Sequence, residues 1–193
     1  VEGGWISEMR DNGICLRPLE ESDITERYLS WFRDETVTRF LESRNISRDD
    51  ALQFMRWGKQ TGNRRLFAIC VEATGLHIGN IKVGDIDQKA STSDLVTFIG
   101  DRDYWGRGIA TTAIRLATAY AFKELGVRKL HAGMYAQNLG SLKCYTRAGW
   151  LVEAVLYYDI VGPDGPTDRF LIACFNPDHY KTLPSFPRPL PKV

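Results

Sequence analysis

The stretch YWGRGIATTAIRLATAYAF, residues 104–122, decides the fold, because a glycine-bearing turn runs directly into an amphipathic helix. Ala113, Ile114 and Ala117 recur at helical spacing and predict its buried face. Glycine at a helix start costs stability, so Gly106 and Gly108 need a reason. Either they allow a tight turn, or they let a phosphate reach the free N–H groups of the helix N-terminus. The spacing matches neither the dinucleotide fingerprint nor the Walker motif, so the two readings stay equal at this point.

The segments around this helix predict an α/β domain with a mixed sheet covered by helices on both faces. Apolar alternation predicts strands, and capping residues with apolar spacing predict helices. The second helix begins at Ser47, where SRDD resembles a capping box. The expected elements are strand 14–20, helix 23–34, a helix from 47, strands 66–73, 77–86 and 94–100, the central helix, strand 129–136, helix 139–149, and strands 151–160 and 168–176.

Three segments divide the chain. Residues 1–12 lack an apolar run and predict a flexible leader. Residues 13–178 form the predicted domain, and the four prolines near the end predict an extended tail over residues 179–193.

Composition excludes several functions. With 25 Lys and Arg against 24 Asp and Glu, the net charge is +1, which offers no basic surface for nucleic acid or anionic lipid. The sequence has no run of about 18 apolar residues, so it predicts no membrane-spanning helix. The 4 cysteines and 3 histidines are scattered, which predicts neither a metal site nor a disulfide framework and favours a cytoplasmic protein.

A second motif follows in NLGSLKCYTRAGW, residues 138–150. Together with Gly108 and Ala110 of the first motif, it resembles the GCN5-related N-acetyltransferase (GNAT) superfamily. The resemblance points to the branch with ribosomal-protein N-terminal and amino-sugar acetyltransferases, where Trp105 replaces the usual Gln or Arg. It implies one GNAT-like α/β domain with a mixed, mostly antiparallel sheet of about seven strands.

The resemblance implies acetyl-CoA as co-substrate and no metal. Main-chain groups of Thr97, Phe98 and Ile99 are expected to pair with the pantetheine amides, as an added strand would. Asn138 is expected to bind the pantetheine arm, and Ser141 either joins it or only caps the following helix. The N–H groups expected to hold the pyrophosphate are those of Trp105, Gly106, Arg107, Gly108, Ile109 and Ala110. The Arg107 side chain either adds charge near a phosphate or is a solvated surface group.

Tyr145 carries the chemistry in this comparison, since a phenol can protonate the departing CoA thiolate. The alternative is a packed aromatic side chain. Asp85, Asp94, Asp101 and His131 are candidate bases, and none is assigned, because a water chain can also remove the amine proton. No cysteine has a nucleophile context, so direct transfer in a ternary complex is expected.

The acceptor is predicted to be a small amine, with a nucleotide-linked amino sugar favoured. Trp31, Phe32, Arg39 and His131 are the expected acceptor-binding residues, since aromatic rings can stack on a sugar and arginine can pair with a diphosphate. Aromatic residues at helical spacing are also typical of a core. A protein N-terminus is the alternative acceptor, and a non-catalytic acyl-CoA sensor is the alternative from another class. A homodimer is left open.

Overall fold

The computed structural model describes residues 8–162 and 164–182. Strands are β1 (Met9–Asp11), β2 (Ile14–Pro18), β3 (Arg65–Val71), β4 (His77–Asp87), β5 (Thr92–Ile99), β6 (Lys129–Tyr135), β7 (Leu151–Gly162) and β8 (Gly165–Phe175). Helices are α1 (Glu26–Trp31), α2 (Glu35–Thr38), α3 (Arg48–Thr61), α4 (Ile109–Lys123) and α5 (Leu139–Arg147), with short 3-10 turns at Glu21–Asp23 and Arg102–Tyr104.

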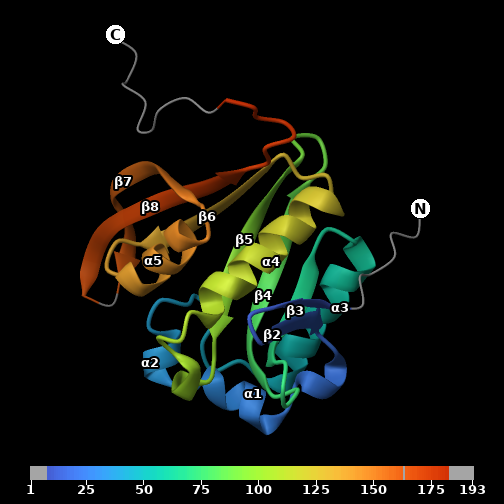
Figure 1. The fold of residues 1–193 in the computed structure, drawn as a ribbon. Coiled ribbons are helices and arrows are strands. Elements are labelled where there is room, and N and C mark those ends of the chain that lie inside the picture. Colours follow the sequence, from blue (N-terminus) through green and yellow to red (C-terminus); the bar gives the residue numbers. More distant parts are fainter. Residues whose placement is uncertain (1–7, 163, 183–193) are drawn as a thin grey trace.

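The eight strands form one sheet in the order β1-β2-β3-β4-β5-β6-β8-β7. Every neighbouring pair is antiparallel except β5 and β6, which run parallel. Helix α4 is the crossover between these two strands, as a parallel pair requires. Figure 1 shows α4 and α5 on one face of the sheet and α3 on the other. The predicted α/β fold with a mixed, mostly antiparallel sheet and helices on both faces is therefore confirmed, with eight strands rather than about seven.

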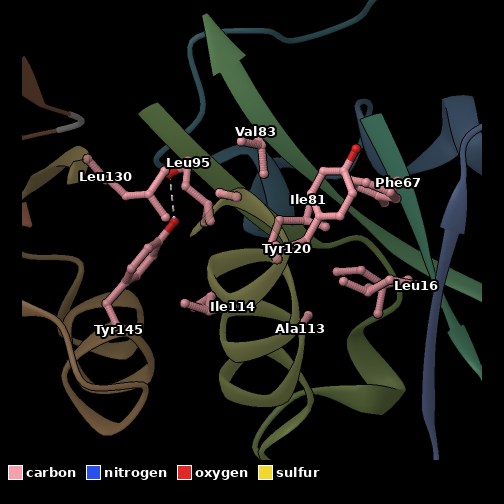
Figure 2. Packing of buried hydrophobic residues seen from close by; sticks show 14 of the residues in the cluster. Leu16, Phe67, Ile81, Val83, Leu95, Ala113, Ile114, Tyr120, Leu130 and Tyr145 are labelled. Atoms are coloured by element: carbon pink, nitrogen blue, oxygen red, sulfur yellow. Dashed lines mark hydrogen bonds between the residues drawn. The ribbon is translucent and has the colours of Figure 1, made fainter. Parts of the chain in front are cut away.

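The larger core lies between the sheet and α4. Ala113, Ile114 and Ala117 of α4 are completely buried, which confirms the apolar face expected from their spacing. They belong to one cluster with sheet residues such as Leu16, Ile81 and Leu95, and Figure 2 shows Ala113 and Ile114 facing these strands. Alanine at 113, 117 and 121 keeps the helix close to the strands, and that closeness fixes where the N-terminus of α4 points.

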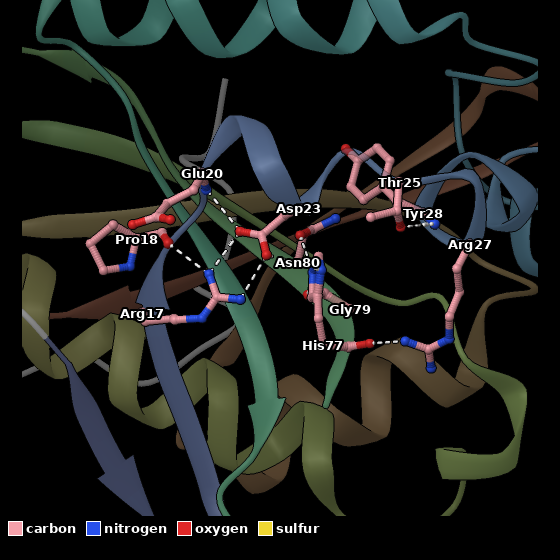
Figure 3. A network of polar contacts seen from close by, with 10 residues as sticks. All are labelled: Arg17, Pro18, Glu20, Asp23, Thr25, Arg27, Tyr28, His77, Gly79 and Asn80. Carbon is pink, nitrogen blue, oxygen red and sulfur yellow. Dashed lines mark hydrogen bonds and ion pairs between the residues drawn. The ribbon is translucent and has the colours of Figure 1, made fainter. Parts of the chain in front are cut away.

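The opposite face holds a second core, made by α1 and α3. Trp31 and Phe32 lie in it, and the Trp31 ring packs edge-on against His77 with 5.1 Å between ring centroids. Gly100 makes this packing fit, since a Cβ there would lie 2.1 Å from the Trp31 ring. Figure 3 shows the polar contacts beside it, in which Arg17 donates two hydrogen bonds of 2.7 Å to the Asp23 carboxylate.

The local signals near the helix starts predicted the structure well. Ser47 caps α3, and its side chain and that of Asp50 form the expected capping box. The first helix is shorter than predicted, because α1 ends at Trp31 and a separate turn, α2, begins after the Asp34 cap. The sheet begins inside the predicted leader, since β1 pairs with β2. Residues 1–7 of that leader and 183–193 of the predicted tail lie outside the described residues.

Candidate active site

The candidate active site is a fork between β5 and β6. The two strands pair in parallel at three positions, Thr92 with Lys129, Ser93 with Leu130, and Asp94 with His131. Beyond this point β5 continues along β4 and β6 continues along β8, so the strands diverge, as Figure 1 shows. From residue 95 onward, one edge of β5 is therefore left without a partner strand among the described residues.

The open edge of β5 presents main-chain groups. The carbonyl of Leu95 accepts a hydrogen bond from the Tyr145 phenol, and that of Ile99 accepts one from the Trp105 indole. Because main-chain direction alternates along a strand, both groups of Thr97 also face the open edge, whereas those of Phe98 turn toward its β4 partner Asn80. Of the three residues predicted to pair with an extended ligand, Thr97 is the best placed.

Tyr145 reaches the fork from α5. Its phenol donates a hydrogen bond of 2.9 Å to the Leu95 carbonyl, drawn in Figure 2, and its ring packs edge-on against Trp150. Burial raises the pKa of Tyr145 well above its ordinary value, so the phenol keeps its proton at neutral pH. A protonated phenol at the point where the strands part can act as an acid, and its ring belongs to the core at the same time.

The turn before α4 exposes the start of the helix dipole. Gly108 is the N-cap in the left-handed conformation at φ 78°, and no side chain caps the helix. Within the described part of the chain, the N–H groups of residues 106–111 meet no acceptor, whereas that of Trp105 donates to the Arg102 carbonyl. A Cβ at Gly106 or Gly108 would meet open space. The glycines are therefore needed for the positive φ of the turn, and the turn leaves six donors for an anion.

A depression of about 400 Å³ lies beside these donors. Arg107, Arg115 and Arg147 line it, together with the first turn of α4 and the β1–β2 turn. Arg107 also lies over the Tyr104 ring, 5.2 Å from its centroid. Three arginines beside a free helix N-terminus give this depression the charge and the hydrogen-bond donors that phosphate groups require. Arg115 and Arg147 carry no motif in the sequence that would mark them as site residues, since they come from two helices, α4 and α5, that only the fold brings together.

On the opposite face of the fork stand Asp94 and Lys82. The Lys82 ammonium lies 2.9 Å from Oδ2 of Asp94, while Oδ1 is buried and has no hydrogen-bond partner in the described residues. Burial raises the pKa of Asp94, and the Lys82 charge opposes that shift. Among the other candidate bases, Asp85 pairs with Arg64, Asp101 pairs with Arg27, and His131 is exposed on β6 directly beside Asp94.

The predicted acceptor residues lie in different surroundings. Trp31 and Phe32 are only 5% and 8% exposed, so their rings serve the second core. Arg39 is exposed and pairs with Asp164 at the β7–β8 turn, with 3.3 Å between charged atoms. His131 is the one of the four that stands at the fork. The packing of the C-terminal end of α1 in the second core therefore accounts for both aromatic side chains.

Asn138 and Ser141 of the second sequence motif lie at the N-terminus of α5. Asn138 is the N-cap, and its side-chain oxygen accepts a hydrogen bond of 3.2 Å from the Ser141 N–H. Ser141 therefore sits in the first turn rather than at the cap. The capping contact uses the oxygen of Asn138 and leaves its NH₂ group for a ligand, which keeps the predicted contact with a pantetheine arm open.

The chain belongs to the Acetyltransferase (GNAT) domain family, which it matches over residues 14–150. It is 30% identical to a probable N-acetyltransferase, YjcK, of Bacillus subtilis, over 88% of this chain and 98% of that protein. A crystal structure of spermidine N-acetyltransferase from Vibrio cholerae, in complex with CoA and spermine, has a similar fold, with a TM-score of 0.78 at 18% identity over 88% of this chain and 99% of that one. So has the ribosomal-protein-S5-alanine acetyltransferase of Vibrio fischeri, with a TM-score of 0.77 at 16% identity over 89% and 97%. The protein is therefore an acetyl-CoA-dependent acyltransferase of the GNAT type.

The residues present fit acetyl-CoA. The free N–H groups of residues 106–111 and the three arginines suit its phosphates, and the open edge at Thr97 suits its amide-bearing arm. In the described residues no group of three or more His, Cys, Asp or Glu side chains is placed to hold a metal ion. Nor is any helix there long and apolar enough to cross a membrane.

Proposed function

We propose that this enzyme acetylates a small aliphatic primary amine that binds as a cation. One observation carries the proposal: the fork holds a protonated phenol, Tyr145, and a buried carboxylate oxygen without a partner, Oδ1 of Asp94. A buried acceptor of this kind requires a donor, and an ammonium group supplies both the donor and the opposite charge. The similarity to spermidine N-acetyltransferase supports the same class of acceptor.

The bound acetyl-CoA supplies the acetyl group as a thioester. Thr97 binds its arm through the main chain, and the N–H groups of residues 106–111, with Arg107, Arg115 and Arg147, hold its phosphates. Binding both substrates in one fork supplies rate by orientation.

Two side chains of the fork move the protons. Asp94 accepts one proton from the acceptor ammonium, which frees the nitrogen lone pair to form the C–N bond. As the C–S bond breaks, Tyr145 gives its proton to the departing sulfur. The second proton lost from the nitrogen restores the phenol, so that one proton in total is released to solvent. Asp94 is the best placed of the candidate carboxylate bases, because one of its oxygens has no partner in the described residues, whereas both oxygens of Asp85 and of Asp101 already accept hydrogen bonds.

The nucleotide-linked amino sugar predicted from the sequence stays a prediction, but the residues expected to bind it have other roles in the structure. Trp31 and Phe32, which were expected to stack on the sugar, are core residues, and Arg39, which was expected to pair with the diphosphate, has a carboxylate partner. A protein N-terminus stays the alternative. A side-by-side assay of CoA release with spermidine, other polyamines, nucleotide-linked amino sugars and Ser- or Ala-starting peptides separates the three. We expect the polyamines to give the highest kcat/KM. Turnover of a peptide or a nucleotide sugar that exceeds every polyamine tenfold would reject the proposal.

We also propose a homodimer joined along β7, in the cytoplasm. β7 is an edge strand, and Tyr157, Tyr158 and Val161 on it are 77%, 77% and 74% exposed. An exposed edge strand with apolar side chains favours pairing with a second strand, and a second copy offers the same strand. Light scattering across a concentration series tests this, with Val161→Lys expected to give monomers. A wild-type monomer at every concentration would reject the dimer.

A further inference from the structure

Lys82 is a partly buried lysine that no step described so far uses. It lies on β4, beside β5, and its ammonium contacts Oδ2 of Asp94 at 2.9 Å. The two side chains are only 20% and 26% exposed, so this ion pair is shielded from solvent more than most surface pairs. The two oxygens of the carboxylate therefore differ: Oδ2 is paired with Lys82, and Oδ1 is buried without a hydrogen-bond partner in the described residues.

We infer that Lys82 is a positioning residue, which holds Oδ2 of Asp94 and keeps the carboxylate charged so that Oδ1 can receive the acceptor ammonium. The inference rests on the proposed function, because it assigns to Asp94 the proton of the acceptor.

The charges around Asp94 explain why such a residue is needed. Burial favours the neutral carboxyl and raises its pKa, and Asp85 on β4 acts in the same direction. Lys82 opposes both, and so does His131 of β6 when it is protonated. Arg64 pairs with Asp85, and Lys82 is the cation that pairs with Asp94. Without Lys82, Asp94 would hold its proton at a higher pH and could not accept one from the acceptor.

The geometry also explains why Lys82 does not block the acceptor. It approaches from β4, next to β5, whereas the fork opens on the other edge of β5, toward β6. Lys82 therefore contacts Oδ2 from the β4 side of β5, and Oδ1 stays free for a cation that enters through the fork on the β6 side.

The test compares Lys82→Met and Lys82→Arg with the wild type in two measurements. The first is a carbon-13 NMR titration of the Asp94 carboxyl in the full-length protein, assigned with Asp94→Asn. The second is the pH profile of kcat/KM for the acceptor. We expect Lys82→Met to raise the pKa of Asp94 by about one unit or more and to shift the acidic limb of the profile upward equally, with KM for acetyl-CoA unchanged. Lys82→Arg should restore both.

Lys129→Met is the matched control. Lys129 lies on β6 in an ion pair of similar exposure, 2.6 Å from Glu153, and should leave the Asp94 titration unchanged. If Lys82→Met does not fold, as judged by circular dichroism, Lys82→Gln replaces it. An Asp94 pKa that is the same in the wild type and the Lys82 variant overturns the inference. Failure of the proposed function is a different result, in which the wild type acetylates no amine while the titration still responds to Lys82.

Discussion

The two sides of the fork are built differently. In the site that we propose, the cofactor side consists of main-chain N–H groups from the consecutive residues 106–111. The proposed acceptor side consists of side chains from three strands, with Lys82 on β4 behind Asp94 on β5, and His131 on β6. A site made from consecutive main-chain groups needs only a particular backbone path, which a few glycines can encode locally. A site made from distant side chains exists only after the strands have found their register.

The aromatic residues show the same contrast. Trp105 lies in the turn before α4, and its indole donates a hydrogen bond to the Ile99 carbonyl at the neighbouring end of β5, so this contact joins residues that are close in the sequence. Trp31 lies in a sequence that resembles a binding surface, yet its ring fills the core between α1 and the sheet. Four predictions test this contrast, in order of decreasing expected effect.

Trp31→Ala should lower the free energy of unfolding by about 3–5 kcal/mol, because it leaves a large cavity in the second core. Chemical denaturation measures this. Trp57→Ala is the control, since Trp57 is 41% exposed, and it should cost much less. Equal losses in the two variants, with a specific rise in acceptor KM for Trp31→Ala, would return Trp31 to the acceptor surface.

Tyr145→Phe should lower kcat on the order of tens- to a thousand-fold, because it keeps the packed ring and removes the proton donor. The affinity for acetyl-CoA should hardly change. Tyr120→Phe removes another hydroxyl from a buried ring in the same core and should keep its turnover. An unchanged kcat for Tyr145→Phe, with chemistry shown to be rate-limiting, would leave Tyr145 a structural residue.

Gly108→Glu should weaken acetyl-CoA binding on the order of a hundredfold, since it places a negative charge where the diphosphate is expected. Calorimetry measures the affinity. Gly126→Glu is a matched control, because Gly126 also has a positive φ, 63°, and open space around it, but lies beyond the C-terminal end of α4. Similar affinities in the two variants would contradict the assignment of the loop.

Replacing Arg115 and Arg147 by Gln should weaken acetyl-CoA binding about tenfold and make it less sensitive to salt, because two charge-assisted contacts are lost. The affinity measured at several salt concentrations tests this. Arg56→Gln is the control, since Arg56 pairs with Glu21 rather than lining the depression. A full salt dependence in the double variant would show that the phosphates bind elsewhere.

Much of the fold could be predicted from local signals. The continuous apolar run of β3, the alternation in β6, the capping box at Ser47 and the apolar spacing of α4 each depend on neighbouring residues. β1 was missed because three residues are too few for a periodic pattern. α2 was not predicted, because its four residues are too few for a helical pattern, and Asp34, its N-cap, was expected to be the last residue of the first helix.

The sequence by itself determined the family, the glycine-bearing turn before α4 and the position of Tyr145 on its helix, because each depends on residues close together in the chain. Only the tertiary structure decided that Trp31 is a core residue, that Arg115 and Arg147 line one depression, and that Asp94 has one paired and one unpaired oxygen. These properties depend on strand register and on burial. A carboxylate acquires its partners and its pKa from groups that approach it across the sheet, and no local pattern in the sequence carries that information.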